Sequence, residues 1–284
     1  MSKTPRNQPR IEPLSVGNAV SGALRLYRDR FKLYCTLALT GYLWVLIPIY
    51  GWAKCSAIFA MISRLAFAEV MERPETVESA RRQVDPKKWR LLGAGILISL
   101  IFLGALIGAT IAFTIVGVTI GVAIGSQNAI AGTLVGILVG TIAFLVGAIG
   151  YLWLFSRLSV VELPIAIEEN LDAAGGISRS WELTKYSAWR IVGVFLLAYL
   201  ITLPIVILLQ LLDPLLRVIL SFFLIPETGL YVTIHFILLL LISLGSGVVL
   251  VPFWQALKAM IYYDLRARRE GLGLELQDTD AWES

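Results

Sequence analysis

Five long stretches of apolar residues constrain this chain more than any other feature of its sequence. A run of about 18 or more apolar residues is typical of a helix that crosses a lipid bilayer. Only 15% of the residues are charged and 57% are hydrophobic, whereas soluble domains have about 25% and roughly 45–50%. We therefore predict an all-α, polytopic integral membrane protein. The runs cover residues 33–53, 91–125, 129–155, 190–212 and 230–257, and a shorter one covers 55–68.

Lysine and arginine residues gather in four parts of the chain: the arm before the first apolar run, 64–90, 157–190, and the end that begins at Lys258. Of the 24 Lys and Arg residues, all except Lys54 and Arg217 fall there. Short cytoplasmic loops are enriched in these residues. We therefore expect all four parts, and both termini, to be cytoplasmic, with the connections near 126–128 and 213–227 outside.

This orientation requires an even number of helices between neighbouring basic segments, which gives about six spans. We place them near 33–51, 53–70, 91–124, 129–155, 190–212 and 230–263. The predicted organisation is a cytoplasmic basic arm and interfacial helix (1–32), a transmembrane hairpin (33–70), an interfacial helix (71–90), a glycine-rich hairpin (91–155), an interfacial segment (156–189), a third hairpin (190–263) and a cytoplasmic acidic tail (264–284).

The segments that precede the three hairpins resemble one another. Each is amphipathic and ends in an aromatic-basic pair before an apolar helix, at Phe31-Lys32, Trp89-Arg90 and Trp189-Arg190. The pattern predicts helices that lie in the plane of the membrane interface. It has two explanations, namely a three-fold internal repeat of units near 14–70, 75–165 and 166–270, or the general preference for aromatic and basic residues where a helix enters a membrane.

Twelve basic residues lie within one or two helical turns of a predicted membrane entry, and we call them the basic collar. Each such residue near an anionic leaflet contributes about 1 kcal/mol, so we expect the collar to bind anionic lipids. The alternative is that these residues only set the topology during insertion. The collar consists of Arg25, Arg28, Arg30, Lys32, Arg81, Arg82, Lys87, Lys88, Arg90, Arg179, Lys185 and Arg190.

Glycine recurs at four-residue spacing in the hairpin 91–155. Small residues at this spacing let two membrane helices approach closely. The pattern predicts either tight packing within the hairpin or a glycine face that meets another copy or another membrane protein. The glycines are Gly104, Gly108, Gly117, Gly121, Gly125, Gly132, Gly136 and Gly140.

Polar groups at membrane depth, which mark transport pathways, are sparse. We expect Asp213 and Arg217 to form a surface ion pair, and His235 to be a hydrogen-bonded structural residue. A single histidine cannot supply a His-rich metal cluster, and no serine has the partners of a catalytic triad. A phosphate-cradling P-loop is also missing from the sequence. We therefore predict a protein that is not an enzyme and has no cofactor or metal.

Three motifs resemble the membrane domain attached to some bacterial glycerophosphoryl diester phosphodiesterases, and its stand-alone relatives of unknown function. In the fused members, hydrolysis belongs to a separate soluble barrel that we expect to be absent here, so the resemblance carries over no catalytic residue. It implies a bacterial plasma membrane or a thylakoid membrane. The motifs are Leu14-Ser15-Val16-Gly17 leading to Leu24-Arg25-Leu26-Tyr27-Arg28, then Ser178-Arg179-Ser180-Trp181-Glu182-Leu183-Thr184, and Tyr262-Tyr263-Asp264-Leu265-Arg266 followed by Arg269-Glu270-Gly271.

These observations favour a non-enzymatic membrane protein that organises, assembles or regulates other membrane components. Its expected partners are membrane lipids and either a membrane protein or a second copy of the chain, and not nucleic acid. One alternative is a permease or lipid-transfer component. Another is a membrane anchor that recruits a soluble hydrolase, which follows from the family resemblance alone.

Overall fold

The computed structural model describes residues 15–125, 128–226 and 228–270, and the regular elements in this part of the chain are all helices. This agrees with the all-α prediction. In chain order they are α1 (Val16–Asp29), α2 (Phe31–Val45), α3 (Tyr50–Val70), α4 (Val77–Val84), the 3₁₀ helix η1 (Asp85–Lys87), α5 (Lys88–Gly125), α6 (Ala129–Leu158), α7 (Glu162–Ile167), α8 (Ala173–Thr184), α9 (Ala188–Phe223) and α10 (Gly229–Glu270).

Four apolar segments, built on α5, α6, α9 and α10, are long and apolar enough to cross a membrane. These helices have 38, 30, 36 and 42 residues. At 1.5 Å per residue they are about 45–63 Å long, which exceeds the roughly 30 Å of a hydrocarbon core. In the most apolar window of each, 28% of the residues or fewer are buried inside the chain. This is the architecture of a multi-pass membrane protein.

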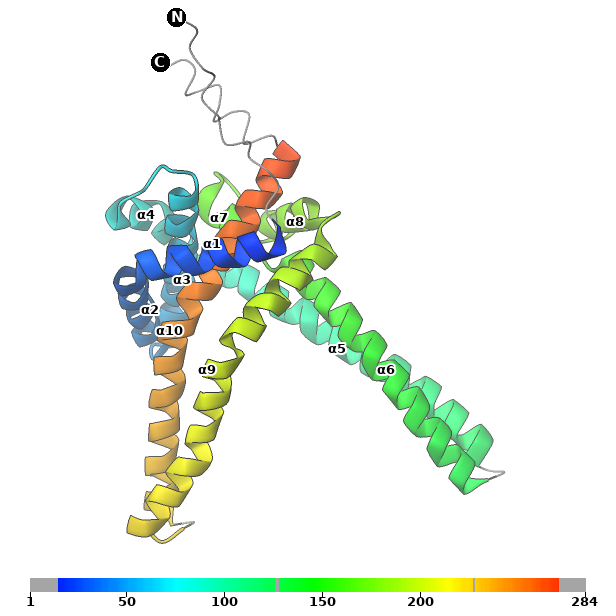
Figure 1. Cartoon of the computed structure of the whole chain (residues 1–284). Coiled ribbons are helices and arrows are strands. Elements are labelled where there is room, and N and C mark those ends of the chain that lie inside the picture. The colour runs from blue at the N-terminus through cyan, green and yellow to red at the C-terminus, as the bar shows by residue number, and fades with distance from the viewer. Residues whose placement is uncertain (1–14, 126–127, 227, 271–284) are drawn as a thin grey trace, which may run out of the picture.

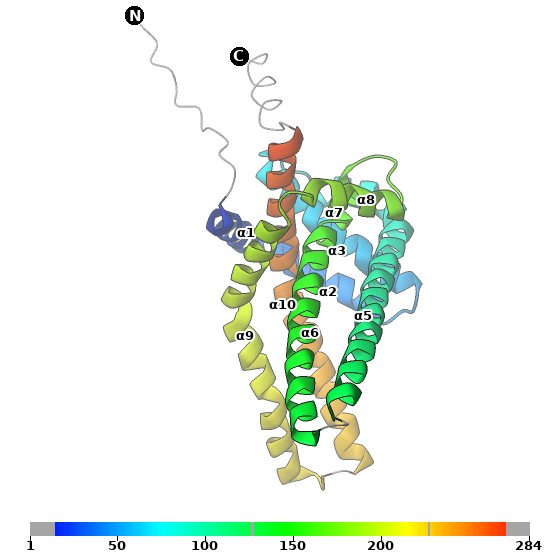
Figure 2. The same cartoon turned by 90° about the vertical axis from the view of Figure 1, so that its right-hand side faces the viewer.

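The long helices form two antiparallel hairpins, α5–α6 and α9–α10, that diverge from a shared end of the molecule (Figure 1). The short helices α1, α4, α7 and α8 gather at that shared end, together with the last turns of α10 (Figures 1 and 2). We call this end the head. The far ends of the two hairpins lie well apart from each other in Figure 1.

The first predicted hairpin, 33–70, differs from the other two. Helix α2 has only 15 residues, or about 22 Å, which is too short for a bilayer core. Helix α3 has 21 residues, but twelve of them are buried. Among the described residues, four helices are therefore candidates for crossing a membrane, whereas we expected six from the sequence.

Lys54 shows where the tip of the α2–α3 hairpin lies. Its Nζ is 2.8 Å from Oδ2 of Asp85 in η1, and the ring of Tyr50 lies 6.4 Å from that of Trp89 at the start of α5. The tip therefore lies beside the entry to α5. A transmembrane hairpin over 33–70 would place Lys54, at its turn, across the membrane from the basic segment 64–90. The ion pair contradicts that placement, because it puts Lys54 beside Asp85.

The core of the molecule explains why α3 is apolar. Side chains of α3, α7 and α10 pack against one another in the head, and Ala60, Ile62, Leu163, Ile165 and Leu257 are completely buried. Protein atoms, rather than lipid, cover most of α3. An apolar sequence serves a buried helix and a lipid-facing helix equally well.

Each hairpin is preceded by a short helix with a side-chain N-cap. Ser15, Thr76 and Asp172 each accept a hydrogen bond from the backbone N–H three residues later, which stabilises the first turns of α1, α4 and α8. Helix α1 lies across α9 and α10 (Figure 1), and the Tyr27 hydroxyl donates to the Val249 carbonyl of α10 at 2.9 Å. A crosswise helix is the arrangement expected of an interfacial one.

The three hairpins contact one another in a cyclic order. The second helix of each hairpin packs on the first helix of the next, since α3 contacts α5, α6 contacts α9, and α10 contacts α2. The short helices follow the same order, because α4 packs on α3, α8 on α5 and α6, and α1 on α9 and α10. A three-fold repeat predicts these contacts, but not the more extensive packing of α3 against α10, which has no equivalent among the described helices of the other hairpins.

Candidate lipid-binding site

The twelve residues of the basic collar lie on α1, η1, α4 and α8, on the first turns of α2, α5 and α9, and directly beside these elements. The structure divides them into residues that hold the head together and residues that face outward. Arg30 belongs to the first group, because its guanidinium is 2.6 Å from Glu69 at the end of α3. Arg190 likewise pairs with Asp264, joining the start of α9 to the end of α10.

A second internal cluster surrounds Arg179 of α8. Its guanidinium contacts Glu168 at 3.0 Å and pairs with Glu270 at the end of α10. Burial opposes the charge of Arg179, but the hydrogen bonds and charges of both glutamates outweigh it and raise the pKa. Lys87 donates to the Glu168 carbonyl at 2.8 Å, and Arg90 donates to a carbonyl just before α8. These collar residues connect elements of the head.

The outward group has no such role. Five collar residues on α1, α2 and α4 have exposed side chains and neither an ion-pair nor a hydrogen-bond partner among the residues that the structure describes. The remaining two collar residues lie over aromatic rings, with the Nζ of Lys88 4.9 Å from the centre of the Tyr50 ring and that of Lys185 5.6 Å from the Tyr186 ring. The five unpaired cations are Arg25, Arg28, Lys32, Arg81 and Arg82.

Exposed aromatic side chains accompany these cations at the helix starts. Phe31 opens α2, Trp89 lies in the first turn of α5, and Trp189 lies in the first turn of α9; 42%, 49% and 60% of their surfaces are exposed. Aromatic residues are enriched where a membrane helix passes through the head-group region. Cations and aromatic anchors therefore occur together where the helices begin.

A buried polar network, which we did not expect from the sequence, lies beneath this surface. The Ser63 hydroxyl, which is completely buried, lies 3.0 Å from Oε1 of Glu162 and 2.8 Å from Oε1 of Gln255. The ammonium group of Lys258 is 3.2 Å from the same Glu162 oxygen. This network joins α3, α7 and α10 at the centre of the head.

A sequence signal could have pointed to this network. The pattern Ser-Arg-Leu-x-x-x-Glu occurs twice in the sequence. Ser63 is the first residue of one copy, and Glu162 is the last residue of the other. The shared spacing marks equivalent positions near the end of the second helix of two hairpins. The two segments are Ser63-Arg64-Leu65-Ala66-Phe67-Ala68-Glu69 and Ser156-Arg157-Leu158-Ser159-Val160-Val161-Glu162.

Arg157 is buried, and no acidic side chain in the described part of the chain forms an ion pair with it. Only 4% of its surface is exposed, and its Nε and Nη1 have no hydrogen-bond partner among the described residues. The guanidinium instead lies 4.3 Å from the centre of the Trp181 ring and 5.6 Å from that of Trp153. A cation over aromatic faces gains up to about 2 kcal/mol when water is excluded. Arg157 therefore fixes α8 against the end of α6.

The glycines of α5 and α6 do not form a continuous packing face within the hairpin. At seven of the eight predicted positions, an added Cβ would have no neighbouring atom within 4 Å. The exception is Gly132, where it would lie 2.7 Å from the Cα of Gly125. The prediction that glycines pack α5 against α6 is therefore wrong, except at this pair beside the turn. The alternative, contact with another molecule, stays a prediction.

The polar residues at the far end of α9–α10 contact one another. Arg217 pairs with Asp213 at 3.3 Å, as predicted. His235 Nε2 is 2.8 Å from Oδ1 of the same aspartate, so the histidine is hydrogen-bonded across the two helices. Among the described residues, no group of three His, Cys, Asp or Glu side chains could hold a metal ion.

No family model, curated protein or solved structure matches this chain. The resemblance to the membrane domain of glycerophosphoryl diester phosphodiesterases therefore stays a prediction.

Proposed function

We propose that this chain is a non-enzymatic membrane protein that organises or regulates other membrane components, and that its head lies at the cytoplasmic surface and binds anionic lipid. The membrane is a bacterial plasma membrane or a thylakoid membrane, as the family resemblance implies. The head holds both the basic collar and the aromatic residues that open the apolar helices, which supports this orientation.

The observation that carries the proposal is the division of the collar. Arg30, Arg179 and Arg190 have acidic partners, so they are neutralised within the head. The five unpaired cations have no such partner among the described residues, and they are exposed. At about 1 kcal/mol for each cation beside an anionic leaflet, five together contribute roughly 5 kcal/mol. That is enough to give the head a preference for anionic lipid.

The test replaces all five unpaired cations with glutamine in the full chain. Purified protein receives either phosphatidylglycerol or phosphatidylcholine, and the lipid-dependent gain in melting temperature is measured at low and high salt. We expect phosphatidylglycerol to stabilise the natural chain more than the variant, and we expect salt to reduce the difference. The control is Arg217→Gln, which removes an exposed cation from the far end of α9.

An unchanged phosphatidylglycerol effect in the five-residue variant would refute lipid binding by the collar. In that case the basic residues serve only to set topology during insertion, and cysteine labelling of the variant in sealed vesicles would show a changed orientation.

The organising role requires contact with another membrane protein or a second copy of the chain. We propose that this contact uses α5 and α6, because most of their glycines have open space beside them and small residues let a neighbouring helix approach closely. Chemical crosslinking in native membranes, followed by purification in mild detergent, tests the idea. Crosslinks at α5 or α6 support it, and crosslinks confined to other helices contradict it.

A further inference from the structure

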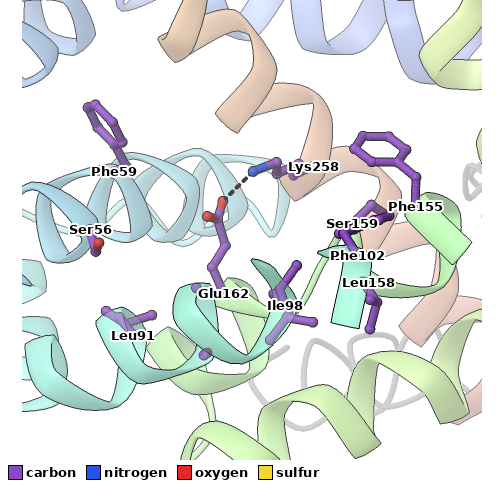
Figure 3. Close-up of a pocket in the computed structure, with 13 residues that line it drawn as sticks. Ser56, Phe59, Leu91, Ile98, Phe102, Phe155, Leu158, Ser159, Glu162 and Lys258 are labelled. Atoms are coloured by element: carbon purple, nitrogen blue, oxygen red, sulfur yellow. Dashed lines mark hydrogen bonds and ion pairs between the residues drawn. The ribbon is translucent and has the colours of Figure 1, made fainter. Parts of the chain in front are cut away.

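A cavity of about 290 Å³ lies beside the buried polar network, between α3, α5, α6, α7 and α10. Its walls are mainly apolar and include Leu91, Ile98 and Phe102 of α5 and Phe155 of α6. Glu162 and Lys258 supply the charged part of the wall and face each other across 3.2 Å (Figure 3). Apolar walls with a few placed polar groups are typical of a small-molecule site.

The polar and apolar parts of the cavity lie at different depths. A contact between two rings shows how the antiparallel helices α5 and α6 are aligned. The ring of Phe102 on α5 lies 4.9 Å from the ring of Tyr151 on α6. At the head, Lys87 reaches the carbonyl of Glu168. Glu162 follows Tyr151 and precedes Glu168 along the chain, so it lies near the start of α5. The charged pair is therefore at the head end, and Phe102 is at the deeper end.

This polarity matches that of a lipid in the head-side leaflet. From Leu91 to Phe102 the cavity follows α5 for about 16 Å, at 1.5 Å per residue. That is close to half of a hydrocarbon core of roughly 30 Å. The volume, 290 Å³, is at the lower limit of ligand sites, which hold about 300–1,000 Å³. The space therefore suits one acyl chain better than two.

The charged pair leaves hydrogen-bonding capacity for a ligand. Ser63 and Lys258 both contact Oε1 of Glu162, and Oε2 has no partner among the described residues. The ammonium group of Lys258 has three N–H donors, and one acceptor in the chain is described for it, the Glu162 carboxylate. A carboxylate and an ammonium group side by side have no net charge, so they favour a ligand that donates and accepts hydrogen bonds without a charge of its own.

We propose that this cavity binds a single-chain, uncharged amphiphile with hydroxyl groups, of the monoacylglycerol type. Its hydroxyl-bearing end lies against Glu162 and Lys258, and its chain extends along Ile98 and Phe102. The site is separate from the basic collar, since the collar favours anionic head groups at the surface and this cavity favours a neutral one. The proposal does not depend on the function proposed above.

The substitution Gly95→Leu is designed to block the cavity. Gly95 lines the wall on α5, and an added Cβ would have no atom within 4 Å. The Cβ of a leucine at this position meets no atom, the rest of its side chain would occupy the cavity, and helix propensity improves by up to about 1 kcal/mol. Gly104 is a matched control, because it also lies on α5 with open space beside its Cα but does not line the cavity.

The experiment uses the full chain in phosphatidylcholine nanodiscs and a photoreactive monoacylglycerol with a diazirine in its acyl chain. Labelled residues are identified by mass spectrometry, with unlabelled monopalmitoylglycerol, palmitate or hexadecane as competitors. We expect saturable labelling at Ile98, Phe102 or Phe155 that monopalmitoylglycerol suppresses best. Gly95→Leu should reduce this labelling at least tenfold, and Gly104→Leu should leave it unchanged.

A change in which competitor suppresses labelling best tests the polar end of the cavity. Glu162→Gln leaves the Lys258 charge without its counter-ion, so palmitate should become the better competitor. Labelling that spreads over the long helices without competition would overturn the proposal. So would equal labelling of Gly95→Leu and the natural chain, or a preference of the natural chain for palmitate. If Glu162→Gln does not fold, the comparison of Gly95→Leu with Gly104→Leu decides the question alone.

Discussion

Removing the ammonium group of Lys54 should loosen the contact that holds the α2–α3 hairpin beside the start of α5. The Nζ–Oδ2 distance to Asp85 is 2.8 Å, and the two side chains are 18% and 34% exposed. At an effective dielectric constant near 20, the direct attraction is about 6 kcal/mol. Desolvation and lost side-chain freedom offset most of it, and a hydrogen bond between charged groups retains about 1.5–3 kcal/mol.

A double-mutant cycle measures this contact. Lys54→Met, Asp85→Asn and the double variant are unfolded reversibly in mixed micelles, and their free energies of unfolding are compared. We expect each single variant to lose about 1.5 kcal/mol, since Asp85 is partly exposed, and the double variant to lose little more than either one. The exposed pair Asp213 and Arg217 provides a control cycle, in which we expect no measurable coupling.

Additive losses in the Lys54 cycle would refute the reasoning. Additivity is the behaviour of residues that do not touch, and it would separate the hairpin tip from the start of α5. The short length of α2 and the burial of α3 would then be the remaining evidence that this hairpin does not cross the membrane.

Three further predictions follow from other parts of the structure. Cysteines introduced at Glu78 and at Asn128 should react with impermeant reagents from opposite sides of sealed vesicles, and reaction from one side would contradict two complete crossings by α5 and α6. Gly121→Leu should fold normally because its side chain meets open space, whereas Gly132→Leu should reduce the yield of folded protein because it clashes with the α5 backbone; equal yields would contradict this. Ser63→Ala should lower the free energy of unfolding by about 1–3 kcal/mol, and with it the melting temperature, because it removes the hydroxyl donor that lies between the Glu162 and Gln255 side chains; an unchanged melting temperature would argue against the network.

The long hairpins could be predicted from the sequence because their apolar runs exceed the length of a bilayer crossing and hold few charges. The same reasoning failed for α2–α3. Hydropathy does not distinguish a helix covered by lipid from one covered by protein, and α3 is covered by α10 and α5. The ion pair that neutralises Lys54 involves a residue 31 positions away in the chain, so the sequence around Lys54 gives no sign of it.

The members of the basic collar could be predicted from the sequence, but the role of each member could not. Proximity to a helix start is visible in the sequence, and all twelve residues share it. The partner of Arg190 is Asp264, 74 positions away, and only the fold brings them together. Sequence reasoning therefore could not separate the cations that connect elements of the head from the five that have no partner among the described residues.

The return of α2–α3 to the head makes the molecule unequal in the two leaflets. With α5, α6, α9 and α10 across a bilayer, the short helices and the first hairpin add to the cross-section of the molecule on the head side, where they gather (Figure 1). Among the described residues, the opposite side consists of the long helices and the short connections between them. More lipid is therefore displaced on the head side, and a flat membrane with many copies would be compressed there. We expect bending of the membrane, with the head side convex, to relieve this compression, so that the local density of the protein and membrane curvature are coupled.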